Sequence, residues 1–148
     1  MPTGSYEPLV SIRPKATFNS IANRGMIIPE SISVFSEDRN VHYKIIFGGT
    51  LTGVSYTSPN ADSITEYDVA ATDISGGIDI TSDYVATGSG NNTGGSSLRD
   101  LVSLLPLFLD ISGAHPTTPY TDVLTIAAIS AEAQSAQCGA TISWRELR

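Results

Sequence analysis

Short segments that alternate apolar and polar residues recur along this chain, and turn-forming residues separate them. The clearest is 78–85, IDITSDYV, in which odd and even positions fall on opposite faces of an extended chain. Comparable segments cover residues 41–47, 50–57, 64–74, 107–111, 123–129 and 140–144. Parallel sheets need a helix between successive strands, and this pattern leaves little room for helices. It predicts an all-β protein, an antiparallel β-sandwich or jelly roll of about eight strands with at most one short helix.

Three local features are predicted within this framework. Ile32–Phe35 and Val41–Phe47 resemble a hairpin around the polar connection 36–40. Ser97–Leu105 is the best helix candidate, with Ser97 as N-cap and leucines at helical spacing before Pro106. An extended run through Leu109 is the competing interpretation. The Gly-, Ser- and Asn-rich stretch 88–97 has little to bury, so it is expected to be a flexible loop.

The length of 148 residues fits one domain. Residues 1–15 are interpreted as an N-terminal arm or lead-in, because Pro2, Gly4 and Pro8 discourage regular structure. Residues 16–148 are then a single β-sandwich domain. Charged residues make up only 16% of the chain, and the polarity comes from 19 Ser and 15 Thr instead. Such a composition favours a turn-rich β protein over a helical bundle.

The charge balance and the single cysteine exclude several classes of partner. The net charge is −7 and the chain has only two lysines, so direct binding to nucleic acid is not expected. No apolar run approaches the roughly 20 residues of a membrane helix, and residues 1–10 do not resemble a signal peptide. Cys138 alone cannot form an internal disulfide. These features predict a soluble protein made in a reducing cytoplasm.

Candidate chemical groups are few, and none forms a recognisable motif. His42 lies within a predicted strand and His115 in a loop, and no GxSxG turn exposes a nucleophile. Cys138 is interpreted as a small core residue, and Trp144 as a core or interface anchor. The acids Glu66, Asp68, Asp79 and Asp83 are interpreted as the solvated faces of strands. A calcium site built from Asp73, Asp79 and Asp83 is a weaker alternative.

Two further functions stay open at this point. A carbohydrate-binding β-sandwich would use a tyrosine beside an acid, for example Tyr84 with Asp83 or Tyr120 with Asp122. A small hydrolase would need two carboxylates that face one cleft about 5 to 10 Å apart. No catalytic residue and no cofactor or metal is assigned.

Several stretches together resemble virion structural proteins of tailed bacteriophages, which are small β-rich proteins encoded among head and tail genes. The resemblance runs from about Ile12 to Leu147 and depends on the order of its motifs. They are FNSIANRGMIIP at 18–29, TLTG at 50–53, EYD at 66–68, DISGGIDITSDYV at 73–85, LPLFLDI at 105–111, DVLTIA at 122–127 and SWREL at 143–147.

This resemblance implies a non-enzymatic virion protein, made in the host bacterial cytoplasm, that acts through subunit contacts. An auxiliary capsid protein, which cements or decorates the shell, is the first expectation; a tail, neck or fibre component is the second. The expected partners are other copies of the chain, as a trimer or another closed ring, and virion proteins such as the major capsid protein. Contacts are expected from the N-terminal arm and the C-terminal strand: Tyr6, Arg13, Trp144, Arg145 and Arg148.

Overall fold

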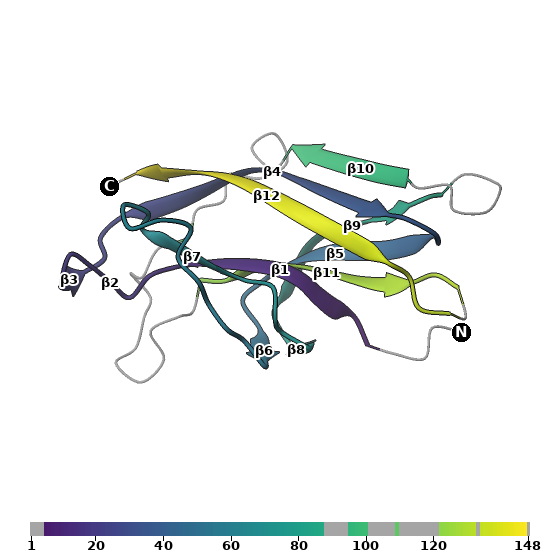
Figure 1. The fold of residues 1–148 in the computed structure, drawn as a ribbon, viewed down its shortest axis with the longest axis horizontal. Coiled ribbons are helices and arrows are strands. Elements are labelled where there is room, and N and C mark those ends of the chain that lie inside the picture. Colours follow the sequence, from purple (N-terminus) through teal and green to yellow (C-terminus); the bar gives the residue numbers. More distant parts are fainter. Residues whose placement is uncertain (1–4, 88–94, 101–108, 110–121, 133, 148) are drawn as a thin grey trace.

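The protein folds into two facing antiparallel sheets. The computed structural model describes residues 5–87, 95–100, 109, 122–132 and 134–147, and that part of the chain contains strands and turns but no helix. The larger sheet has the strand order β7 (Thr65–Asp68), β1 (Glu7–Pro14), β11 (Leu124–Ser130), β5 (Val41–Phe47) and β9 (Ile78–Val85). The smaller sheet has the order β10 (Gly95–Asp100), β4 (Met26–Ser36) and β12 (Cys138–Leu147). The predicted all-β antiparallel sandwich is therefore confirmed (Figure 1).

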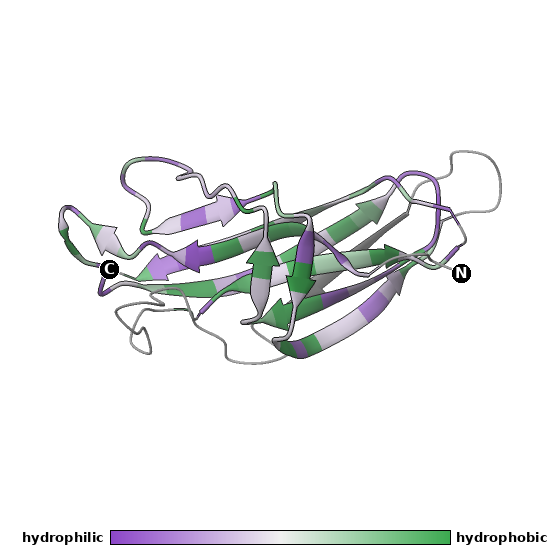
Figure 2. Ribbon diagram, turned by 90° about the horizontal axis from the view of Figure 1, so that it is seen from below, coloured by the Kyte–Doolittle hydropathy of each residue, from purple (hydrophilic) through white to green (hydrophobic). Residues whose placement is uncertain are grey.

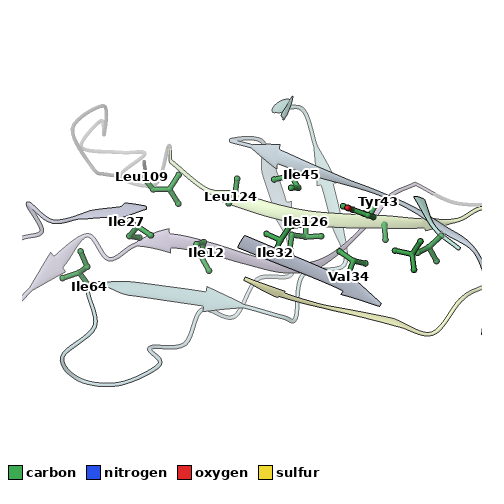
Figure 3. Packing of buried hydrophobic residues seen from close by; sticks show 13 residues of the cluster. Ile12, Ile27, Ile32, Val34, Tyr43, Ile45, Ile64, Leu109, Leu124 and Ile126 are labelled. Carbon is green, nitrogen blue, oxygen red and sulfur yellow. The ribbon is translucent and has the colours of Figure 1, made fainter. Parts of the chain in front are cut away.

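The hydrophobic core lies between these two sheets. Figure 3 shows the buried side chains that the strands of both layers contribute. β1, β5 and β11 supply Ile12, Tyr43, Ile45, Leu124 and Ile126 from one side, and β4 supplies Ile27, Ile32 and Val34 from the other. The β-branched and aromatic residues of these strands thus bury the core faces of both sheets, and β11 in the middle of the larger sheet is buried on both faces.

Two short ribbons lie outside this sandwich. β2 (Thr17–Phe18) pairs with β3 (Ile21–Ala22) in a tight hairpin whose turn residues, Asn19 and Ser20, have positive φ. β6 (Thr50–Thr52) pairs with β8 (Asp73–Ser75) and lies on the side of the larger sheet that faces away from β4 and β12 (Figures 1 and 2). Green and purple bands alternate along several strands in Figure 2, as the period-2 pattern predicts.

The predicted hairpin between Ile32–Phe35 and Val41–Phe47 is wrong. β4 and β5 follow each other in the chain but belong to different sheets. The connection between them contacts residues 131–137: Glu132 accepts hydrogen bonds from Arg39 and from the Asn40 amide, and Asp38 accepts one from the Gln137 amide. Crossing between the layers brings the apolar faces of β4 and β5 together across the core, whereas a hairpin would place them side by side.

The segment predicted as a helix begins as a strand. Gly95–Asp100 forms β10 and pairs with Ser31–Ser36 of β4, so Ser97 is not an N-cap. The backbone of Gly95–Asp100 is paired with β4 instead. This tertiary pairing overrides a weak local preference for helix. Residues 95–97 of the predicted flexible loop belong to the same strand, while 88–94 and 101–105 lie outside the described residues. The described residues include no helix long and apolar enough to cross a membrane.

Most of the predicted N-terminal arm belongs to the sheet. Glu7–Pro14 forms β1, which pairs with β11 on one side and β7 on the other. Ile12 in this strand is completely buried. The boundary proposed at residue 15 therefore falls inside the folded unit, because the alternation of Val10, Ser11 and Ile12 gives β1 a core face that the nearby prolines do not abolish. Of the predicted strand 107–111, only Leu109 is described, and it forms an isolated bridge with Ile27.

Two adjacent glycines lead into β9, and the second has no room for a side chain. Gly77 has a φ of +87°, and a Cβ there would lie 2.6 Å from Cγ2 of Ile46 and 3.1 Å from the Gly49 nitrogen. We expect Gly77→Ala to destabilise the fold by about 1–3 kcal/mol, because it adds a steric clash to an unfavourable φ. The measurement is the free energy of unfolding from urea titration.

Gly76→Ala is the matched control for that substitution. Gly76 also has a positive φ, +70°, but an added Cβ would meet nothing within 4 Å. Its substitution isolates the cost of the backbone conformation, so it should destabilise less than Gly77→Ala. Equal losses for the two variants would contradict the packing argument at Gly77.

Candidate interaction surfaces

The residues predicted to form an interface do not gather in one place. Tyr6 directly precedes β1 and Arg13 lies in it, on the larger sheet, whereas Trp144 and Arg145 lie in β12 of the smaller sheet. Arg148 lies outside the described residues. The four described residues therefore come from two different sheets, and the interface they were predicted to form stays a prediction.

Arg13 makes its contacts within the chain. Its Nε donates a hydrogen bond to Oε1 of Glu66 at 2.6 Å, and its guanidinium carbon lies 3.5 Å from the ring centroid of Tyr56. The Tyr56 hydroxyl lies 3.1 Å from that of Ser11, and burial raises the pKa of Tyr56, so this hydroxyl stays protonated. The side chain of Arg13 is only 17% exposed. Its evident role is to hold the Tyr56 segment against the outer side of the larger sheet.

The pattern of burial along β12 separates Trp144 from Arg145. Ile142 and Trp144 are partly buried and pack against the core, while Ser143 and Arg145 are exposed on the other face. Of the two roles proposed for Trp144, the structure thus supports the core one. Its indole Nε1 donates a hydrogen bond to Glu146 at 3.2 Å.

Glu146 joins the end of β12 to the start of β7. Its Oε1 accepts hydrogen bonds from the hydroxyls of Ser63 at 2.5 Å and Thr65 at 2.7 Å, and its Oε2 accepts one from the Ile64 amide at 3.1 Å. Desolvation by itself would raise the pKa of this carboxyl, but these hydrogen bonds and the one from Trp144 outweigh it and lower the pKa. The carboxylate is a structural link, and no pattern in the sequence indicated it, because Ser63, Ile64 and Thr65 are 81 to 83 residues away in the chain.

The outer face of the smaller sheet carries small hydroxyl side chains. Ser33 lies opposite Thr141 and Ser31 opposite Ser143 in the β4–β12 register, and all four point away from the core-facing Ile32 and Val34. We call these four residues the hydroxyl face. Phe35 continues it, packed over Gly139 and 44% exposed. None of the four residues of the hydroxyl face is charged; Glu30 and Arg145 lie beyond one end, and Asp100 of β10 is the register partner of Ser31.

A second surface, on the outer side of the larger sheet, combines aromatic and charged groups. His42 lies opposite Tyr84 in the β5–β9 register, and their ring centroids are 4.6 Å apart. The Tyr6 ring meets the His42 ring edge-on at 5.7 Å, and the Tyr6 hydroxyl is hydrogen-bonded to Nδ1 of His42. The Lys44 ammonium lies 4.1 Å from the centroid of the Tyr6 ring. We call Tyr6, His42, Lys44 and Tyr84 the aromatic shelf.

Tyr6 is anchored on the shelf by its hydroxyl, which is hydrogen-bonded to Nδ1 of His42. Burial is the main cause that raises the pKa of Tyr6, so the phenol stays protonated. The contact with His42 places the N-terminal segment on its own domain. No pattern in the sequence predicted the aromatic shelf, because the pairing of β5 with β9 brings together His42 and Tyr84, which are 42 residues apart in the chain.

The acids considered for catalysis or calcium binding are separated and mostly engaged. Glu66 pairs with Arg13, Asp79 lies 3.2 Å from the Lys44 ammonium, and the buried Asp68 accepts hydrogen bonds from the amides of Ser55, Ala70 and Ala71. The described residues contain no group of three His, Cys, Asp or Glu side chains that could hold a metal ion, so Asp73, Asp79 and Asp83 do not form the calcium site considered above.

The remaining candidates divide between the core and the part of the chain that is not described. Cys138 is half-buried and packs against the core, and burial raises the pKa of its thiol, as expected for a small core residue. His115 and Tyr120 lie outside the described residues.

Comparison with known proteins assigns no relationship. No protein-family model matches the sequence, and neither the curated proteins nor the solved structures include a significant match. The function therefore has to be argued from the two surfaces and from the sequence.

Proposed function

We propose that this chain is a non-enzymatic structural protein of a bacteriophage virion, an auxiliary capsid component that stabilises or decorates the shell through contacts between subunits. The order of sequence motifs described above supports the virion assignment. The observation that supports this mode of action is the hydroxyl face, two neighbouring cross-strand pairs of uncharged Ser and Thr residues on a protein with a net charge of −7.

The physical argument concerns the cost of burying a surface against a neighbour. Charged side chains lose their hydration when they enter an interface and are depleted from interface cores. Neutral hydroxyls can exchange water for hydrogen bonds across the contact, so burying them costs less. Phe35, at the end of the hydroxyl face, offers an exposed apolar group for the same contact. Because an assembly repeats such a contact many times, each one can be weak and the whole still stable.

Charge introduced into the hydroxyl face should break this contact. We expect the wild-type chain to form a trimer or another closed ring in light scattering, and to bind capsids. Ser33→Glu combined with Thr141→Glu should shift it to a monomer and abolish capsid binding, because two carboxylates would be desolvated in each contact. Both side chains point outward, so the variant should remain folded by circular dichroism.

The matched control adds the same charge elsewhere. Thr17→Glu combined with Thr52→Glu changes exposed residues of β2 and β6 and should leave the assembly unchanged. A wild-type chain that is strictly monomeric and binds no capsid would refute the proposal. If the chain binds a tail or fibre preparation but not capsids, it is instead a component of the tail or fibre.

A further inference from the structure

The aromatic shelf has the form of a ligand platform. Three separate parts of the chain build it: Tyr6 precedes β1, His42 and Lys44 come from β5, and Tyr84 comes from β9. The His42 ring contacts the rings of both Tyr6 and Tyr84, and Tyr84, at the outer end of the series, is 62% exposed. Tyr84 thus presents its ring to solvent while His42 supports it from the side of the sheet.

The contacts beneath Tyr84 hold the platform in place before any ligand arrives. His42 packs against the Tyr84 ring at 4.6 Å and is itself hydrogen-bonded by Tyr6. Tyr6 is in turn covered by the Lys44 ammonium at 4.1 Å. A ring fixed in this way loses little conformational entropy when a ligand stacks on it, and pre-organisation of this kind raises affinity.

Polar groups of both kinds that a sugar needs lie at the Tyr6 end of the shelf. The Lys44 ammonium supplies donors and the Asp79 carboxylate supplies acceptors, and the two are 3.2 Å apart. A pyranose ring presents a face of C–H groups, which suits the electron-rich face of a tyrosine, and a rim of hydroxyls that both donate and accept hydrogen bonds.

The charge of the protein narrows the ligand class. With a net charge of −7, and with Asp79 at the shelf, an anionic ligand would be repelled. We propose that the aromatic shelf binds a neutral glycan in which one sugar ring stacks on Tyr84 and hydroxyls of the next sugar meet Lys44 and Asp79 at the Tyr6 end of the shelf. The inference does not depend on the proposed place in a virion, because it uses only the outer side of the larger sheet.

The test is to titrate the whole chain with defined sugars and to monitor its amide chemical shifts by ¹H–¹⁵N NMR. The probes are neutral disaccharides containing glucose, galactose, mannose or N-acetylglucosamine, with sialyllactose as the charged comparison. At least one neutral disaccharide should shift the amides of residues 42, 44 and 84. Tyr84→Ala should weaken that binding about tenfold or more, since aromatic anchors carry most of the energy of such contacts. Tyr84→Phe, which keeps the ring, should retain most of it.

Ile78→Ala is the matched control, because Ile78 is a comparably exposed apolar residue of the same strand, at 66%. It should leave sugar binding unchanged, and all three variants should keep the wild-type melting temperature within a few degrees. The proposal is overturned if no neutral sugar in the panel shifts these amides, if sialyllactose alone does so, or if binding survives Tyr84→Ala. A change in oligomeric state caused by Tyr84→Ala without any sugar binding would make the shelf a subunit contact instead.

Discussion

Ile126→Ala is expected to destabilise the protein by about 2–5 kcal/mol, a large share of the roughly 5–15 kcal/mol that stabilises a typical domain. Ile126 lies in β11, the middle strand of the larger sheet, with no exposed surface. It belongs to the cluster of buried residues that joins the two sheets, shown in Figure 3. Removing three carbon atoms there loses their burial and leaves a cavity that neighbours held in two sheets cannot readily fill.

The measurement is the free energy of unfolding from urea titration of the whole chain. Ile78→Ala supplies the comparison, because the same atoms are deleted from a side chain that is 66% exposed, and its cost should stay below about 1 kcal/mol. Similar losses for both variants would mean that the core does not lie between the two sheets as described.

Glu146→Ala is expected to cost about 1–3 kcal/mol at pH 7, because it leaves several partly buried donors without an acceptor. The Ser63 and Thr65 hydroxyls, the Ile64 amide and the Trp144 indole all donate to this carboxylate. Glu146→Gln should cost less, since its amide oxygen can still accept part of this set. Glu37→Gln, at an exposed position, should change the stability by no more than about 0.5 kcal/mol.

The same carboxylate makes part of the stability depend on pH. The pKa of Glu146 is lower in the folded protein than its ordinary value of 4.5, so the folded state favours the charged form. Its contribution is therefore fully present above the unfolded pKa and is lost as the pH falls through the folded pKa. The stability difference between wild type and Glu146→Gln should shrink from pH 7 towards pH 3. A difference that is constant over this range would show that the charge of Glu146 does not stabilise the fold.

Local sequence patterns predicted the positions of the strands better than they predicted which strands pair with each other. The alternation over Ile78–Val85 matches β9 in full, and the last two predicted strands fall within one to three residues of β11 and β12. Such patterns record which side of a strand faces apolar surroundings, but they do not record which strand lies next to it. That is why the hairpin of Ile32–Phe35 with Val41–Phe47 was wrong although both segments are strands.

The candidate surfaces show the same limit. Tyr84 was singled out beside Asp83, its neighbour in sequence, yet the structure places His42 against its ring and adds Tyr6 through a hydrogen bond. Arg13 contacts Glu66 and Tyr56 within the chain, which the sequence did not indicate, and its contact with another subunit stays a prediction. In each case the partner comes from a distant segment, and no spacing within the sequence encodes its proximity.

The amino-acid sequence by itself determined the all-β class, the period-2 faces of the strands and the acidic, lysine-poor surface, because each of these follows from the identity and spacing of neighbouring residues. The tertiary structure alone decided that β4 and β5 lie in opposite sheets, that β10 extends β4, and that rings from three segments meet on one surface. These outcomes depend on which pairings bury the most apolar area while satisfying the backbone, and that is a property of the whole chain.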